Sequence, residues 1–205
     1  MGDFKANVDK VKWACSQARK KRADIILFPE LTLTGYPPED LLFKNSFIKN
    51  CREALKKVAT HTRGLTVVIG FAERKGKHLY NSAALICDGG YVGTARKMLL
   101  PNYGVFDEKR YFTEGDEPVR FSLQGVQIGL TICEDIWAWP EIRERGGDPA
   151  RARVVVQGLR PRSKRAGSRL RQVDIDRVAA GSEVVRTTAG IVEDYGCLRE
   201  APDEI

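Results

Sequence analysis

The sequence is poor in histidine, has no long apolar run and contains no closely spaced cysteine pair. Two histidines among 205 residues, His61 and His78, provide no cluster of metal-ligating side chains. No apolar stretch approaches the ~20 residues that a membrane-spanning helix needs. The five cysteines form no CxxC motif, which favours free thiols in a reducing compartment over a disulfide scaffold. These absences predict a cytoplasmic globular protein with no metal centre and no membrane partner.

The composition changes sharply along the chain. The whole is 42% hydrophobic and 30% charged, with a net charge of +7, which is typical of a globular domain with a sizeable core. Beyond residue 140, however, the basic residues are one lysine and twelve arginines, and the one aromatic residue is Tyr195. We therefore predict a core over residues 1–148 and an arginine-rich, degenerate tail over 149–205 that is partly disordered.

Hydrophobic periodicity predicts a mixed α/β protein. Apolar residues at spacings of three and four indicate two amphipathic helices, and short apolar runs indicate strands covered on both faces. Single strands after helices, together with two hairpins, favour mixed sheets over a simple doubly wound one. The expected helices are 4–21 and 40–59, the single strands 23–30 and 65–74, the hairpins 79–96 and 119–133, with weaker strands at 154–156 and 173–175.

Three chemically different side chains follow or end predicted strands. Glu30 offers a carboxylate, Lys97 an ammonium group and Cys133 a thiol. Together they are able to act as general base, oxyanion stabiliser and nucleophile, which suffices to break a carbon–nitrogen bond through a covalent intermediate. Taken singly, each has an ordinary explanation: strand-end carboxylates and lysines are usually solvated, and a free cysteine is usually a small buried apolar residue. The conjunction of the three favours a catalytic site.

The sequence around these residues resembles the nitrilase, or carbon–nitrogen hydrolase, superfamily. The blocks FPEL, RKMLLPNYGVFDE and CEDIW are similar to its three signature blocks, which carry a Glu–Lys–Cys triad. The segment LTGYPPEDLL narrows the resemblance to the N-terminal glutaminase domain of the glutamine-dependent NAD synthetase family. The resemblance implies an α-β-β-α sandwich with mixed sheets, here incomplete.

The resemblance also assigns roles residue by residue. It makes Glu30 the base, Lys97 the oxyanion-stabilising lysine and Cys133 the nucleophile. It further implies a set of substrate-binding residues. Tyr103 is then a pocket tyrosine and Glu134 a carboxylate near the amino group of glutamine, while Trp137 forms an aromatic pocket wall. Tyr36 belongs to the turn that shapes the site, and Glu108 is a second, supporting glutamate.

The implied reaction is hydrolysis of the glutamine side-chain amide through a cysteine thioester, which releases ammonia for NAD synthesis. This half-reaction needs no cofactor and no metal. In the resembled enzymes a synthetase domain uses ATP, Mg²⁺ and deamido-NAD, but this sequence has no glycine- and serine-rich pyrophosphate loop and no Walker motif. The resemblance also implies a homo-oligomer.

The sequence departs from the family pattern at both ends. In the resembled domain a first strand precedes the point at which this sequence begins. We therefore expect that strand to be missing and its neighbour to be left with an open edge. Between residues 149 and 172 the sequence looks foreign to the family, and its swing from lysine to arginine suggests an internal deletion or a frameshift.

Three other interpretations stay open. The first is that the chain is an inactive, truncated remnant of the NAD synthetase. The second is that it is a free-standing amidase of the same superfamily. Binding of nucleic acid through the arginine-rich tail is disfavoured, because the tail carries one aromatic residue and no RNA or DNA motif.

Overall fold

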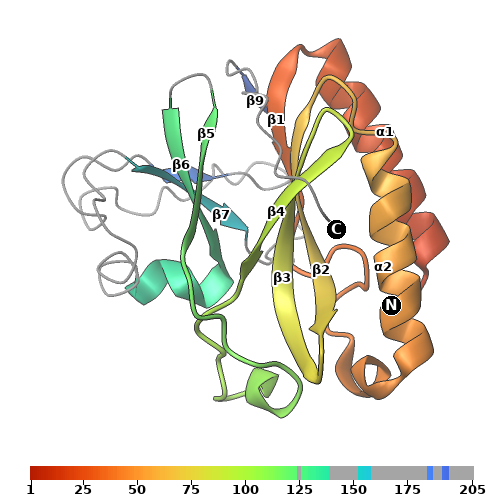
Figure 1. The fold of residues 1–205 in the computed structure, drawn as a ribbon, viewed down its shortest axis with the longest axis vertical. Coiled ribbons are helices and arrows are strands. Elements are labelled where there is room, and N and C mark those ends of the chain that lie inside the picture. Colours follow the sequence, from red (N-terminus) through yellow and green to blue (C-terminus); the bar gives the residue numbers. More distant parts are fainter. Residues whose placement is uncertain (124–125, 139–151, 158–183, 187–190, 194–205) are drawn as a thin grey trace, which may run out of the picture.

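The computed structural model describes residues 1–123, 126–138, 152–157, 184–186 and 191–193, with side chains for residues 1–123 and 128–135. Two helices lie against one of two sheets, and the second sheet packs against the other face of the first (Figure 1). The helices are α1 (Phe4–Lys20) and α2 (Asn45–Ala59). The strands are β1 (Ala23–Leu27), β2 (Thr66–Lys75), β3 (His78–Cys87), β4 (Gly90–Arg96), β5 (Val119–Leu123), β6 (Val126–Ile132), β7 (Ala152–Gln157), β8 (Val184–Arg186) and β9 (Ile191–Glu193).

Helix α1 forms over nearly the predicted range. The side chain of Asp3 caps it by accepting a hydrogen bond from the Ala6 N–H at 2.9 Å, and Arg19 and Lys20 lie in its last turn, where positive charge suits the helix dipole. Its buried face consists of the residues whose spacing predicted the helix: Val8, Val11, Cys15 and Ala18.

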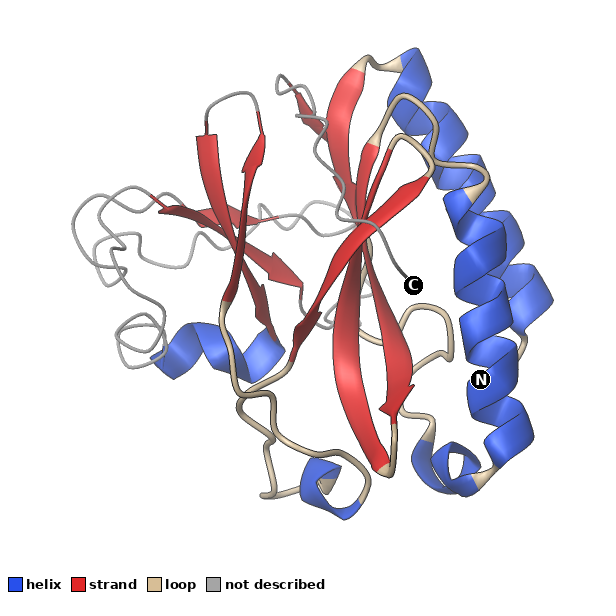
Figure 2. Cartoon of the chain, viewed as in Figure 1, coloured by secondary structure: helices blue, strands red, loops and turns tan. Residues whose placement is uncertain are grey.

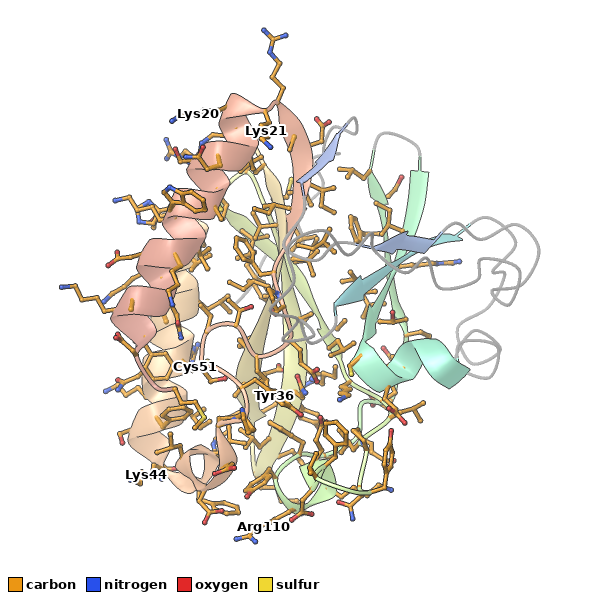
Figure 3. All side chains as sticks on the ribbon, turned by 180° about the vertical axis from the view of Figure 1, so that it is seen from behind. Lys20, Lys21, Tyr36, Lys44, Cys51 and Arg110 are labelled. Atoms are coloured by element: carbon orange, nitrogen blue, oxygen red, sulfur yellow. The ribbon has the colours of Figure 1, made fainter. Side chains whose placement is uncertain are left out.

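The second predicted helix was wrong at its start. Residues Glu39–Phe43 form a short 3-10 helix, η1, and Lys44 has an extended backbone with ψ of 116° before α2 begins at Asn45. The extended residue interrupts the i to i−4 hydrogen bonding, so the two segments are not continuous. Figure 3 shows Cys51 between α2 and the sheet, where its side chain is fully buried.

The first sheet has the strand order β4-β3-β2-β1-β9, with β1 and β2 parallel and the other neighbours antiparallel. Its central strands are buried on both faces. In β1, Ile26 packs beneath the helices, whereas Ile25 and Leu27 face the second sheet, as the period of two requires. Strand β9 pairs antiparallel with β1 and forms one edge of this sheet.

The second sheet has the order β5-β6-β7-β8 and also mixes parallel and antiparallel pairs (Figure 2). An apolar cluster with Leu123, Ile128, Leu130 and Ile132 fills the space between the two sheets. The described residues thus form one helical layer and two sheets. The predicted strand at 154–156 is confirmed as part of β7, while the one predicted at 173–175 lies outside the described residues.

The hairpin between β3 and β4 turns as predicted. Asp88 and Gly89 have φ of 50° and 87°, and two successive positive values are what a two-residue type I′ turn requires. The hairpin predicted at 119–133 is confirmed as the antiparallel pair β5 and β6.

The cysteines differ from the expectation at one position. Cys15, Cys51 and Cys133 are free thiols, but Cys87 takes part in a disulfide, which the sequence analysis did not predict. Among the described residues, no helix has the length and apolar character that a membrane crossing requires.

Candidate active site

The first predicted site residue, Glu30, lies in the loop that leaves β1. This loop is pressed against β2: a Cβ atom on Gly70 would lie only 2.4 Å from the Leu31 nitrogen and 2.6 Å from the Pro29 oxygen. Because glycine has no Cβ atom, the loop that carries Glu30 packs directly against the backbone of β2. The side chain of Glu30 is fully buried there. Leu31 itself has φ of 50°, so the chain turns sharply immediately after the carboxylate.

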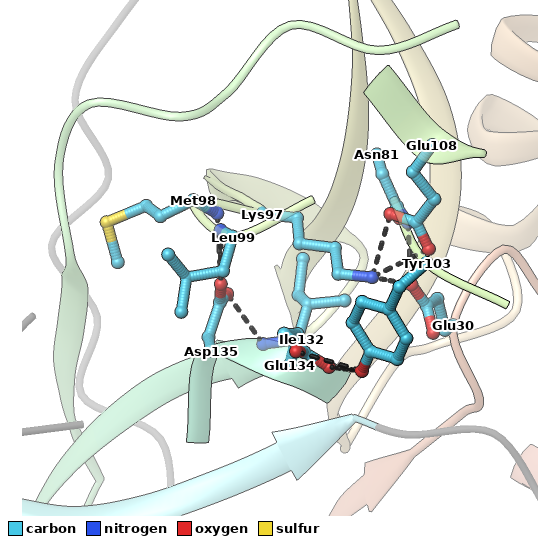
Figure 4. A network of polar contacts seen from close by, with 10 residues as sticks. All are labelled: Glu30, Asn81, Lys97, Met98, Leu99, Tyr103, Glu108, Ile132, Glu134 and Asp135. Atoms are coloured by element: carbon cyan, nitrogen blue, oxygen red, sulfur yellow. Dashed lines mark hydrogen bonds and ion pairs between the residues drawn. The ribbon is translucent and has the colours of Figure 1, made fainter. Parts of the chain in front are cut away.

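Lys97 follows the last residue of β4, and its side chain is completely buried. Its Nζ lies 2.9 Å from Glu30 Oε1 and 2.8 Å from both Glu108 Oε1 and Glu108 Oε2 (Figure 4). Glu108 opens the 3-10 helix η2 (Glu108–Arg110). One ammonium group is therefore held between two carboxylates from separate parts of the chain, a geometry in which charged hydrogen bonds are strong.

Burial and charge act in opposite directions on this cluster. Burial tends to lower the pKa of Lys97, but the carboxylates of Glu30 and Glu108 outweigh it, so its pKa is raised and the amine stays protonated. Burial raises the pKa of Glu108 to about 7, against the opposing pull of Lys97. The site therefore holds a permanent cation beside a carboxyl group that titrates near neutral pH.

Cys133 begins the 3-10 helix η3 (Cys133–Ala138) immediately after β6. Its φ of 49° is unusual for a residue with a side chain and marks a sharp turn at the strand end. Burial raises the pKa of the thiol to about 12, and the negative charge of Glu30 adds to this rise while Lys97 opposes it. The N–H groups of Ile132, directly before Cys133, and of Met98, directly after Lys97, both bind the Asp135 carboxylate, so the strand end that carries the thiol lies beside the one that carries Lys97. The high pKa of the thiol means that a base must remove the proton during attack.

Around the thiol the other predicted residues are placed as follows. The Tyr103 hydroxyl donates to Glu134, 3.1 Å from each carboxylate oxygen, and Tyr103 is exposed (Figure 4). Burial raises the pKa of Tyr36, and the charges of Glu30, Glu108 and Cys133 raise it further. Trp137 belongs to η3, and its side chain lies outside the described residues.

Sequence reasoning missed two buried polar residues. Asn81, in β3, donates from Nδ2 to Glu30 Oε1 at 2.6 Å. Asp135 accepts the backbone N–H groups of Met98 and Leu99 at 3.1 and 2.9 Å through Oδ1, and that of Ile132 at 3.0 Å through Oδ2. A buried Asn within an apolar strand was a possible signal for the first, whereas only the folded chain shows the second.

Asp135 links the segment that carries Lys97 to the segment that carries Cys133. The N–H groups that it binds follow Lys97 on one side and precede Cys133 on the other, so one carboxylate joins the ends of β4 and β6. Burial raises its pKa to about 6, although the backbone hydrogen bonds oppose the rise. Among the described residues no group of three His, Cys, Asp or Glu side chains is placed to hold a metal ion.

A buried carboxylate, a buried amine and a strand-end thiol are the side chains that the resemblance to carbon–nitrogen hydrolases implied. The family model for carbon–nitrogen hydrolases matches residues 1–156. The chain belongs to this family.

Relatives with similar sequences include glutamine-dependent NAD(+) synthetases, which are longer than this chain. A glutamine-dependent NAD(+) synthetase from Thermotoga maritima is 47% identical over 139 residues, which cover 67% of this chain and 24% of that protein. One from Aquifex aeolicus is 40% identical over 157 residues, or 76% of this chain and 27% of that protein. The chain thus spans about a quarter of the length of these relatives.

Solved structures with a similar fold include an NAD+ synthetase and an amidase. The glutamine-dependent NAD+ synthetase from Acinetobacter baumannii, with ADP bound, superposes with a TM-score of 0.71 at 36% identity, covering 80% of this chain and 31% of that one. An amidase from Nesterenkonia sp. AN1 superposes with a TM-score of 0.64 at 25% identity, covering 76% and 61% of the two chains. That structure is of a Glu-to-Gln mutant of the amidase and shows acrylamide added to its active-site cysteine.

Proposed function

We propose that this chain hydrolyses the side-chain amide of glutamine through a thioester on Cys133 and so supplies ammonia for NAD synthesis. The observation that carries the proposal is the buried contact of Lys97 with Glu30 and Glu108 beside a thiol at a strand end. The substrate is proposed from the similarity to glutamine-dependent NAD(+) synthetases.

The reaction begins with proton transfer from Cys133 to Glu30. The high thiol pKa means that little thiolate exists in advance, so general-base assistance is required as sulfur attacks the amide carbon. A carbon–sulfur bond forms and the carbonyl oxygen takes the negative charge. Protonated Glu30 then gives its proton to the leaving nitrogen, the carbon–nitrogen bond breaks, and ammonia departs.

Lys97 stabilises the oxyanion in this scheme. Its ammonium group has three protons and contacts two carboxylates, and one proton shared between the two oxygens of Glu108 leaves another for the substrate. A well-placed donor of this kind contributes about 3–4 kcal/mol to transition-state stabilisation. The remaining thioester is cleaved by water, whose proton passes to Glu30 and then to the departing sulfur, and glutamate leaves.

The exposed pair of Tyr103 and Glu134 is the proposed recognition site for the substrate backbone. The hydroxyl holds the Glu134 carboxylate by both oxygens, so its negative charge is fixed near the thiol, where an α-ammonium group of glutamine is complementary to it. Trp137, Tyr36 and Glu108 complete the proposed pocket.

The partners and cofactors stay predictions. The ammonia would pass to a synthetase domain, which lies outside this sequence and uses ATP, Mg²⁺ and deamido-NAD. The glutaminase half would need no cofactor of its own. Cytoplasmic location and assembly into a homo-oligomer are proposed on the same grounds of similarity.

A second candidate is a free-standing amidase, which the similarity to the Nesterenkonia enzyme supports. The two candidates differ in what they ask of Glu134, because a simple aliphatic amide has no ammonium group for it to bind. Comparing glutamine with propionamide therefore separates them: a preference for propionamide that is unaffected by Glu134→Gln favours the amidase.

The nucleophile is tested by ammonia release from glutamine by the wild type, Cys133→Ala and Cys15→Ala. Cys15 is also a free thiol, but it is buried beneath α1. We expect Cys133→Ala to lose activity by at least about 1,000-fold and Cys15→Ala to retain it. Retained activity in Cys133→Ala would remove the assigned nucleophile.

A further inference from the structure

Asn81 contacts two members of the proposed triad. Its side-chain Nδ2 donates to Glu30 Oε1 at 2.6 Å, and its backbone carbonyl accepts the Lys97 N–H at 2.8 Å. The residue is fully buried in β3. Asn81, in the first sheet, is thus hydrogen-bonded to both Glu30 and Lys97, and Figure 4 shows its side chain beside this cluster.

The strand register explains why Asn81 reaches the site. Side chains alternate between the two faces of a strand, and Asn81 shares its face with Ala83 and Leu85, which pack between the two sheets. The next residue, Ser82, points to the opposite face and donates to Glu73 at 2.9 Å. Asn81 therefore faces the sheet that carries Cys133.

The two oxygens of Glu30 are not equivalent. Oε1 accepts from both Asn81 and Lys97, whereas Oε2 is buried and has no hydrogen-bond partner among the described residues. Asn81 Oδ1 is likewise buried and lacks a partner within the part of the chain that the structure describes. Unsatisfied buried acceptors are rare in proteins, and two in one site indicate a place where donor groups arrive. A primary amide and the Cys133 thiol are such donors.

We propose that Asn81 is a positioning residue that holds Glu30 by Oε1 and so leaves Oε2 as the oxygen that receives the Cys133 proton. The inference rests on the proposed function, because it requires Glu30 to be the base. Lys97 alone would not fix the carboxylate as well, since its ammonium group rotates and also binds Glu108. The planar amide of Asn81 has a defined direction and adds no charge.

The test replaces Asn81 by leucine, which has nearly the same shape and no hydrogen-bonding group. Ser82→Ala is the matched control, because it removes a partly buried side-chain hydrogen bond from the adjacent residue on the opposite face. For each variant two quantities are measured: kcat and KM for glutamine, and the rate of Cys133 alkylation by iodoacetate as a function of pH. The alkylation rate reports on the base without requiring turnover.

We expect Asn81→Leu to lower kcat by about 100-fold or more while KM changes by less than about threefold, because a misplaced base affects proton transfer and not binding. Alkylation near neutral pH should slow by about tenfold or more and recover at high pH, where the thiol ionises without help. Ser82→Ala should match the wild type in both. A merely structural role for Asn81 would lower stability without altering the pH dependence of alkylation.

A wild-type kcat and alkylation profile in folded Asn81→Leu would overturn the inference. If that variant does not fold, as judged by a circular-dichroism melt, Asn81→Ser answers the same question, since its shorter side chain cannot reach Glu30. Glu30→Gln separates the two levels of the argument. Loss of alkylation at neutral pH in Glu30→Gln, but not in the Asn81 variants, sinks the role of Asn81 alone, whereas wild-type behaviour in Glu30→Gln sinks the proposed base.

Discussion

Replacing Lys97 by methionine should destabilise the fold more than its single charge suggests. The ammonium group is completely buried, and its Nζ lies within 2.9 Å of Glu30 and 2.8 Å of Glu108. Methionine fills nearly the same volume, so packing changes little, but two buried carboxylates lose their cation. Removing one partner of a buried ion pair costs about 3–5 kcal/mol of unfolding free energy. For a chain of this size that corresponds to a fall in Tm of about 6–20 °C.

The loss should depend on pH in a definite direction. Without Lys97, the burial that already raises the pKa of Glu108 to about 7 acts unopposed. A carboxyl group whose folded pKa lies above its unfolded value contributes stability at low pH, and that contribution disappears as pH rises through the window between them. Lys97→Met should therefore be much less stable than the wild type at pH 7 and recover part of the difference at pH 5.

Urea unfolding followed by circular dichroism at both pH values measures these differences. Lys56→Met is the control, because Lys56 forms an exposed ion pair with Glu53 at 3.1 Å. Such a pair contributes at most about 1 kcal/mol, so this variant should lie close to the wild type. The reasoning fails if Lys97→Met loses less than about 1 kcal/mol at pH 7, or if its loss is the same at both pH values.

Two further predictions concern the loop that carries the base and the second carboxylate. Gly70→Ala should push on the loop before Leu31, where the new Cβ would lie 2.4 Å from a backbone nitrogen, and should lower both glutaminase activity and stability, the latter by about 1–3 kcal/mol. Gly93→Ala is its control, since a Cβ there meets nothing within 4 Å, and equal effects in the two variants would contradict the steric argument. Glu108→Gln should flatten the pH dependence of stability: the rise of this pKa from 4.5 to about 7 predicts that the wild type loses about 3 kcal/mol of unfolding free energy across that interval. Urea unfolding between pH 4.5 and 7 checks this, and a variant curve parallel to the wild-type curve would contradict it.

The structure brings two of the predicted site residues together, with Lys97 Nζ 2.9 Å from Glu30 Oε1, while the catalytic roles assigned to them stay predictions. Strand ends and side-chain chemistry pointed to Glu30, Lys97 and Cys133 because catalytic chemistry needs unusual residue types at fixed places, and such places are visible in one dimension. The start of α2 was missed because the extended backbone at Lys44 is a local choice that apolar periodicity does not encode.

Asn81 and Asp135 were beyond the reach of sequence reasoning for a different physical reason. Their side chains act on groups from other strands: Asn81 on Glu30, and Asp135 on the backbone beyond Lys97. Such contacts depend on how β3, β4 and β6 lie in space. An asparagine within an apolar strand is a weak signal for Asn81, but a single sequence identifies neither its partner nor those of Asp135. The division at residue 148 and the character of residues 149–205 stay predictions.

Trapping the acyl-enzyme tests the central claim most directly. The chain is mixed with glutamine, quenched rapidly in acid, digested and analysed by mass spectrometry. The account predicts a glutamyl group on the peptide that contains Cys133, and its absence from Cys133→Ala treated in the same way. Release of ammonia from glutamine with no adduct on Cys133, or with the adduct on another side chain, would contradict it.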